Sequence, residues 1–261
     1  MVIKMTNEHI PEKTEYIEKL DILGVPLAKL DSYSHAEDYI VNRIENKEKT
    51  FCVAINPEKT YRSFSDENLK ELLGKADLHI CDGVGSAIAA KWLTGHKVGR
   101  VTGVQLFLNL MAKAEEENLK VYLLGAGPDA NEGAYNNLLQ KHPKLKIVGR
   151  QDGYFEDDNI VIEHINETKP DMLFVAMGSP KQEYWIDTHK ENLDASYFMG
   201  VGGTFDVVSG KVKWAPKFFR KTGTEFLYRF ACEPTKRWRR EILRLKFGLK
   251  VIKTKLFGSK H

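Results

Sequence analysis

A short apolar run, repeated along the chain and each time followed by a polar or glycine-bearing turn, constrains the fold most. Its clearest copy is MLFVAM at 172–177, which ends at the tripeptide GSP and is followed by Lys181, Gln182 and Glu183. A run of this length suits one strand that is buried on both faces, as in a parallel sheet. Ligands of open α/β sheets bind beyond the carboxyl ends of such strands. The turn after 177 is therefore either a ligand-binding element or an ordinary solvated β-to-α turn.

Comparable apolar runs alternate with helical segments over most of the chain. Beyond a strand or hairpin at 20–30, strands are predicted at 51–55, 77–81, 120–124, 145–149, 172–177 and 197–201. Helices are predicted at 34–48, 66–74, 87–93, 103–118, 131–141, 159–168 and 181–190. This alternation is typical of βαβ units. We therefore predict an α/β fold with a Rossmann-like, largely parallel sheet flanked by helices.

The charge distribution separates the end of the chain from the rest. Residues 211–261 hold 16 Lys and Arg against 3 Asp and Glu, a net charge of +13, while the chain as a whole carries +3. We predict a loose leader at 1–18, a core at 19–210 and a basic helical appendage at 211–261. A basic end indicates a polyanionic partner, such as a membrane surface, a nucleic acid or a diphosphate. Nucleic acid is disfavoured because the body is acidic.

The appendage contains an amphipathic helical pattern. One apolar stripe runs through Trp238, Ile242, Leu245, Leu249, Ile252 and Leu256, and a shorter one through Leu243, Phe247 and Val251. Lys and Arg residues surround both stripes. Such a helix either lies on an anionic membrane surface or packs on the body of the protein.

Other features argue against several classes of protein. No apolar run approaches the roughly 20 residues that span a bilayer, and the first residues lack the apolar core of a secretory signal. We therefore expect a cytoplasmic location. The three cysteines suggest no disulfide framework, and Cys52 and Cys81 fall in apolar runs typical of a core. The histidines show no metal-binding spacing, so a dedicated metal site is not expected. No cofactor is predicted either.

Polar residues that follow the predicted strands are candidates for chemistry. Asp82 follows an apolar strand, so it is either a general base or the N-cap of the helix predicted at 87–93. Gly125 opens a Gly-Ala-Gly turn, which is weak support for a dinucleotide site. Arg100 is either a phosphate ligand or a solvated surface residue.

The strand-end motifs, taken in order, resemble those of the WecG/TagA/CpsF family of glycosyltransferases. The match extends from about Leu20 to Arg240. Its motifs are INPE (55–58), ICDGVG (80–85), RVTG (100–103), VYLLGAG (121–127), IVGRQDGYF (147–155), FVAMGSPKQEYW (174–185) and MGVGGTFDVVSGKVKWAP (199–216).

The resemblance implies an inverting, metal-independent transfer of a sugar from a UDP donor. The sugar is expected to be N-acetylmannosamine, or a related hexose or uronic acid. The expected acceptor is a GlcNAc-type sugar linked to undecaprenyl diphosphate, in cell-surface polysaccharide or teichoic acid synthesis. Partners are then the donor, the lipid-linked acceptor and an anionic membrane at the inner face of the cell membrane. The resemblance leaves a homo-oligomer open.

The family's functional residues fall on specific positions of this chain. The resemblance makes Asp82 the catalytic base that deprotonates the acceptor hydroxyl. With the glycine turns, it predicts these substrate-binding residues: Asn56, Arg100, Gly125, Tyr154, Gln182, Gly203, Asp206, Arg229, Lys236 and Arg239. The last three lie on the appendage and are expected to neutralise a diphosphate. The chain departs from the family at Ala54, where Thr is usual, and at Lys236, where Arg is usual.

Two other functions fit parts of the sequence. The Gly125 turn on a predicted Rossmann-like sheet fits a nicotinamide-dependent oxidoreductase. Ala54, in place of a hydroxyl that would touch substrate, fits a non-catalytic protein that binds a sugar nucleotide or acts as a membrane adaptor. Comparing the binding of UDP with that of NAD would distinguish an oxidoreductase from a glycosyltransferase. Formation of a glycosylated product would distinguish a glycosyltransferase from a non-catalytic protein.

Overall fold

The structure is a computed structural model that describes residues 16–258, so nearly all of the predicted leader lies outside it. Its centre is a six-stranded sheet in the order β4-β3-β8-β7-β5-β6, in which all neighbouring strands run parallel. The strands are β3 (Thr50–Ile55), β4 (Leu78–Cys81), β5 (Lys120–Gly125), β6 (Lys146–Gln151), β7 (Met172–Ala176) and β8 (Tyr197–Gly200). All six strand predictions are confirmed, and so is the α/β fold with a parallel sheet.

A small antiparallel hairpin lies beside the main sheet. Its strands are β1 (Lys19–Ile22) and β2 (Val25–Ala28). Leu23 and Gly24 connect them, both with positive φ, as the tight turn of a hairpin requires. The predicted strand or hairpin at 20–30 is therefore a hairpin.

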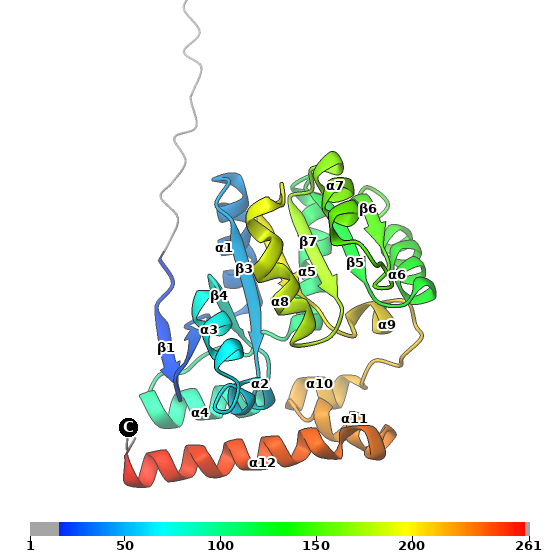
Figure 1. Cartoon of the computed structure of the whole chain (residues 1–261). Helices are drawn as coiled ribbons and strands as arrows, with labels where there is room; N and C mark the ends of the chain where they lie inside the picture. Colours follow the sequence, from blue (N-terminus) through cyan, green and yellow to red (C-terminus); the bar gives the residue numbers. More distant parts are fainter. Residues whose placement is uncertain (1–15, 259–261) are drawn as a thin grey trace, which may run out of the picture.

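Helices cover both faces of the sheet (Figure 1). In chain order they are α1 (Tyr33–Glu45), α2 (Pro57–Arg62), α3 (Glu67–Lys75), α4 (Val84–Thr94), α5 (Gly103–Glu116), α6 (Pro128–Lys141), α7 (Asp158–Thr168), α8 (Lys181–His189), α9 (Thr204–Val208), α10 (Lys217–Thr222), α11 (Glu225–Cys232) and α12 (Pro234–Phe257). A 3-10 turn, η1 (Lys190–Asn192), follows α8.

Strand β7 shows how the sheet divides the core in two. Met172 and Phe174 face a cluster with α1, α5 and α6, whereas Leu173 and Val175 face a cluster with α3, α7 and α8. Side chains alternate between the faces of a strand. Both faces of β7 are therefore buried, which explains its uninterrupted apolar run.

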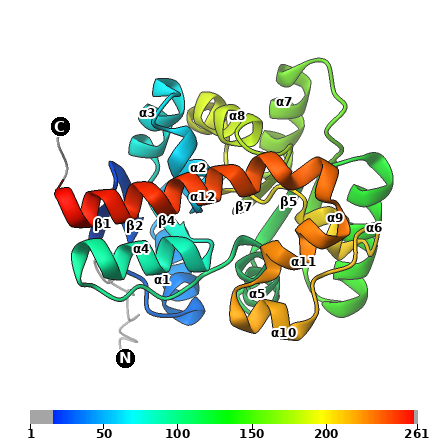
Figure 2. The same cartoon turned by 90° about the horizontal axis from the view of Figure 1, so that it is seen from below.

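The carboxyl ends of the strands all point toward one edge of the molecule, and α10, α11 and α12 lie across that edge (Figures 1 and 2). Helix α12 passes over α2 and α4 and buries Phe247 and Val251 in the core cluster on the α3 side. The shorter apolar stripe of the appendage is thus the one that docks on the body. The longer stripe stays largely exposed.

Several short helices were not expected from the sequence. Helix α2 begins where the sequence INPE suggested only a turn after a strand. Its start signals are present: Asn56 is the N-cap and accepts a hydrogen bond from the backbone N–H of Lys59 at 2.9 Å, and Pro57 occupies the first turn. Proline is favoured at that position because the first turn needs no N–H donor.

Candidate active site

A cavity of about 840 Å³ lies at the carboxyl ends of β3, β4 and β8, beneath α11 and α12. Of the predicted site residues, the structure brings together at its walls Asn56, Asp82, Arg100, Gln182, Gly203 and Arg229. These come from six separate stretches of the chain. Those that follow strands converge because parallel strands end at the same edge of the sheet.

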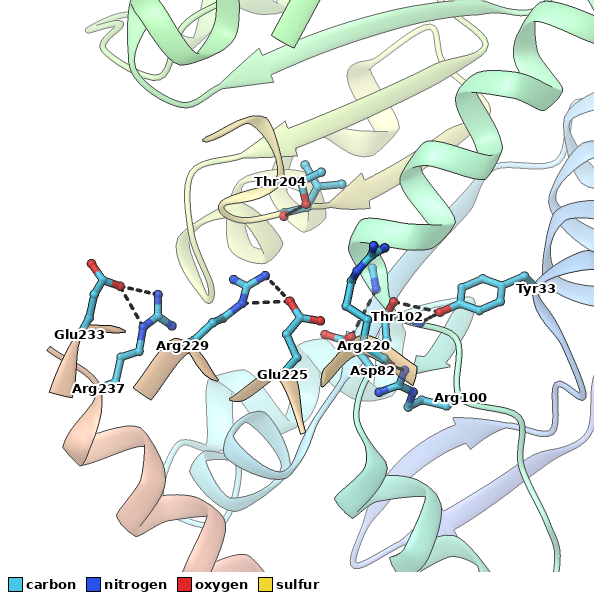
Figure 3. A network of polar contacts seen from close by, with 12 residues as sticks. Tyr33, Asp82, Arg100, Thr102, Thr204, Arg220, Glu225, Arg229, Glu233 and Arg237 are labelled. Atoms are coloured by element: carbon cyan, nitrogen blue, oxygen red, sulfur yellow. Dashed lines mark hydrogen bonds and ion pairs between the residues drawn. The ribbon is translucent and has the colours of Figure 1, made fainter. Parts of the chain in front are cut away.

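Asp82 lies directly after β4 and is the only aspartate among the described residues that line the cavity. Its Oδ1 accepts a hydrogen bond from the backbone N–H of Gly103 at 3.3 Å, in the first turn of α5. The N-cap interpretation is wrong for the following helix, because α4 begins at Val84 with Gly83 as its N-cap and has no side-chain cap. Asp82 instead serves the start of α5, a helix that is distant in sequence (Figure 3).

The surroundings of Asp82 favour a carboxyl group that can hold a proton. Burial raises its pKa, the Gly103 N–H opposes that rise, and the nearby Glu225 carboxylate adds to it. Lys59 and Arg229 act in the opposite sense, but the net direction is upward. A desolvated carboxylate with a raised pKa is a stronger base than a solvated one.

A buried ion pair also lines the cavity. Lys59 Nζ lies 2.7 Å from Glu183 Oε1, with the two side chains only 6% and 2% exposed. Burial would raise the pKa of Glu183, but Lys59 and the amide of Gln182 together hold it below its ordinary value. Lys59 could not be predicted as a site residue from the sequence, because its partner is 124 residues away and no local pattern links the two.

Gln182 is locked between this pair and the turn after β8. Its Nε2 donates to Glu183 Oε1 at 3.1 Å, and its Oε1 accepts from the backbone N–H of Gly202 at 2.9 Å. A Cβ on Gly200 would lie 2.3 Å from Gln182 Nε2, so a side chain there would displace Gln182. Gln182 therefore shapes the wall, and its role toward substrate stays a prediction.

Arg100 joins the core to the appendage. Its Nη2 donates to the backbone carbonyl of Arg220 in α10 (Figure 3). It lines the main cavity and also a neighbouring one of about 550 Å³, whose wall includes Lys217, Arg220 and Lys221. Arg100 is thus not a solvated surface residue.

Two arginines of the appendage, Arg229 and Arg237, are each paired with an acid four residues earlier in the chain. Arg229 lines the cavity, and its Nε donates to Glu225 Oε1 at 2.9 Å. Arg237 makes the corresponding bonds to Glu233 at 3.0 and 2.8 Å (Figure 3). Arg239 is exposed, stacks 5.4 Å from the Trp238 ring and lies outside the cavity wall. The side chain of Lys236, predicted to bind substrate, lies outside the described part of the chain.

Three further predicted residues do not line this cavity, although one of them lies close to its rim. Gly125 ends β5 and packs against β7, where a Cβ would lie 2.7 Å from the backbone of Ala176. Tyr154 follows β6 and is 80% exposed. Asp206, in α9, lies near Gly203 at the cavity rim, with Oδ2 3.6 Å from the position a Cβ there would take. Their role in substrate binding stays a prediction.

Ala54, the departure from the family pattern, also lines the cavity. It lies in β3, two residues before Asn56. The missing hydroxyl would therefore have faced the site. The thiols of Cys52 and Cys81 are buried, as expected, and burial raises the pKa of each to about 12.

The described residues contain neither a candidate metal site nor a candidate membrane-spanning helix. Within 16–258, no group of three or more His, Cys, Asp and Glu side chains is placed to hold a metal ion. Metal independence of the reaction stays a prediction. In the same range, no helix combines the length and the apolar character that crossing a membrane requires.

Known proteins resemble this chain along nearly its whole length. The model of the glycosyl transferase WecG/TagA/CpsF family matches residues 20–261. A Bacillus spizizenii protein is 31% identical over 248 residues, which cover 95% of this chain and 94% of the relative. Two others are from Bacillus subtilis, 30% identical over 83% of this chain and 84% of the relative, and from Staphylococcus aureus, 33% identical over 94% and 96%. All three are named N-acetylglucosaminyldiphosphoundecaprenol N-acetyl-beta-D-mannosaminyltransferase.

Proposed function

This chain belongs to the WecG/TagA/CpsF family of glycosyl transferases, and from that premise we propose its reaction. It transfers N-acetylmannosamine, or a closely related sugar, from a UDP donor to the GlcNAc of a GlcNAc-diphospho-undecaprenol acceptor. The transfer inverts the anomeric centre and uses no metal ion. The sugar and the acceptor follow the names of the relatives, which specify both and a β-linked product.

The observation that carries the proposal is the Asp82 carboxylate, which lines the cavity, is half-buried and has cationic side chains nearby. In the transfer, Asp82 accepts the proton of the acceptor hydroxyl. The hydroxyl oxygen attacks the anomeric carbon of the donor sugar as the bond to the diphosphate oxygen breaks. Because attack comes from the face opposite the leaving group, an α-linked donor yields a β-linked product.

The leaving UDP takes the electron pair of the broken bond, so its diphosphate gains negative charge. Arg100 and Arg229 both line the cavity and can donate to phosphate oxygens. Cationic donors aimed at developing charge stabilise a transition state more in a desolvated site than in water. These two arginines supply what a metal ion supplies in other transferases.

Replacing Asp82 with Asn tests the base. We expect turnover to fall by roughly 10²- to 10⁴-fold, while the affinity for UDP, measured by calorimetry, stays close to that of the wild type. Asp194→Asn, an exposed change before the amino end of β8, is the matched control. Unchanged consumption of UDP-sugar in the Asp82 variant would show that this residue is not the base.

Loss of folding can be separated from loss of the base. The folded-state pKa of Asp82 is raised, so its ionised form costs stability once the pH is above that pKa. Asn cannot ionise, and the variant is therefore expected to melt no lower than the wild type at neutral pH. An inactive variant with a lowered melting temperature would leave the base to be tested by Asp82→Glu.

The donor can be identified by ligand-induced stabilisation, since a ligand bound to the folded state raises its melting temperature. UDP and UDP-sugars are expected to raise it and NAD is not. A shift with NAD alone would favour the oxidoreductase alternative. A shift with UDP-sugar but no product on a GlcNAc-diphospho-lipid would favour the non-catalytic alternative.

We place the enzyme at the inner face of the cell membrane through the outer surface of α12. Leu249, Leu256 and Phe257 are between 66% and 73% exposed there, among lysines of the same helix. An apolar face with flanking cations suits an anionic bilayer surface. Leu249→Ser combined with Leu256→Ser is expected to weaken flotation with vesicles that contain phosphatidylglycerol. Undiminished flotation of this variant would contradict the assignment.

A further inference from the structure

The catalytic cavity continues as an apolar groove between α4 and α12. We define this groove by Ile88 and Trp92 on α4 and by Leu245, Gly248 and Ile252 on α12, all of which line the cavity that contains Asp82. Both views show α4 beside the C-terminal part of α12 (Figures 1 and 2). The four large side chains of the groove are 43% to 70% exposed. A contiguous exposed apolar surface next to a polar site marks a place where a ligand binds.

The wall of the groove changes from polar to apolar with distance from the base. Helix α4 begins two residues after Asp82, and Val84, Ile88 and Trp92 follow at intervals of four along its cavity face. At 1.5 Å per residue, Trp92 lies about 12 Å farther along the helix than Val84. On α12, Glu241 and Arg244 precede Leu245, Gly248 and Ile252 in the same wall.

We propose that this groove binds the first isoprene units of the polyprenyl chain of the acceptor. The inference rests on the proposed function. A sugar-diphosphate-polyprenol presents a hydroxyl, then a diphosphate, then an apolar chain. The cavity offers a carboxylate at Asp82, guanidinium groups at Arg229 and Arg244, and then the groove. The chemical order of the acceptor therefore matches the order of the wall.

Continuity with Asp82 selects this occupant over the acyl chain of a bilayer lipid. A hydrocarbon chain bound in the groove would lie in the same cavity as the base. The groove is therefore suited to a molecule whose other end reacts at Asp82. The residues assigned to the bilayer surface, Leu249, Leu256 and Phe257, do not line the cavity. The two apolar surfaces of α12 thus have separate ligands.

At Gly248, a larger side chain would block the groove without the loss of any existing side-chain contact. A Cβ at this position would meet nothing within 4 Å, and leucine is a better helix former than glycine. For Gly248→Leu we expect the KM for farnesyl-diphosphate-linked GlcNAc to rise by roughly 10-fold or more. The KM for the ethyl-diphosphate-linked analogue, which has no isoprenoid, is expected to stay unchanged. Lys246→Leu, which adds the same side chain at an exposed position outside the cavity, is the control.

A binding measurement separates this proposal from the proposed function. Farnesyl phosphate is titrated into the full chain by calorimetry without donor, and its affinity is expected to fall by the same factor in Gly248→Leu. Equal losses for both acceptors, no loss for either, or a parallel loss of vesicle binding would overturn the groove assignment. A wild-type protein that binds farnesyl phosphate but transfers sugar to neither acceptor would overturn the proposed function while leaving the groove in place.

Discussion

Two walls of the same cavity differ in how deeply their ion pairs are buried. The core wall contains the Lys59–Glu183 pair, whose side chains are almost completely buried. The appendage wall contains Arg229, paired four residues away on its own helix with Glu225, with 30% and 21% of the two side chains exposed. Breaking a buried pair strands a desolvated charge, whereas exposed pairs contribute little to stability. The core wall is therefore preformed, and the appendage wall can exchange its acid for a phosphate.

The largest effect should follow from breaking the core pair. We expect Lys59→Met to lower the free energy of unfolding by about 3–5 kcal/mol, because Glu183 would be left buried without its cation. Urea denaturation followed by circular dichroism measures the change. Arg229→Gln, the matched change in the other wall, is expected to cost less than about 1 kcal/mol. Similar losses in the two variants would remove the distinction between the walls.

Replacing Arg229 should affect activity much more than it affects stability. Arg229→Gln is expected to lower kcat/KM for the UDP donor by roughly 10- to 100-fold, since a hydrogen bond to a charged group is worth about 1.5–3 kcal/mol. Arg237→Gln removes a similarly paired arginine that does not line the cavity, and it should change kcat/KM little. Equal losses for both would mean that the appendage acts through its general charge and not through Arg229.

The pH dependence should link the two walls. Asp82 must be ionised to accept a proton, and its pKa is raised chiefly by burial and also by Glu225. We therefore expect kcat/KM to fall as the pH drops through a value above the ordinary range of aspartate. Glu225→Gln removes one cause of the rise, so the acid limb should move to lower pH. A limb that stays in place in this variant would indicate that the acid of the appendage does not act on the base.

The smallest expected effect comes from a substitution in the core wall. Ala54→Thr restores a hydroxyl that faces the cavity from β3, a strand position that suits a β-branched residue. Because a single neutral hydrogen bond is worth about 0.5–1.5 kcal/mol, the KM for the donor should fall by roughly 2- to 10-fold. A higher KM would show that the site is adapted to alanine.

Much of the site was predictable from local sequence. The ordered motifs indicated the family, which is confirmed, and they indicated Asn56, Asp82 and Arg100, which the structure brings to one cavity. Each follows the end of a strand or precedes a helix, and parallel strands gather such positions at one edge. Gly125, Tyr154 and Asp206 were predicted by the same motifs but do not line that cavity. A sequence motif identifies a residue, but it does not give the distance between that residue and the other residues of the site.

The sequence alone determined the strands, the parallel sheet and the amphipathic character of the last helix, because these depend on periodicity and on short-range propensity. Only the tertiary structure decided which apolar stripe of α12 docks, since both stripes satisfy the helical period and the body selects Phe247 and Val251. It also decided the partners of Lys59 and Asp82, which come from distant segments. Burial and long-range pairing depend on what surrounds a side chain, and no local pattern encodes that.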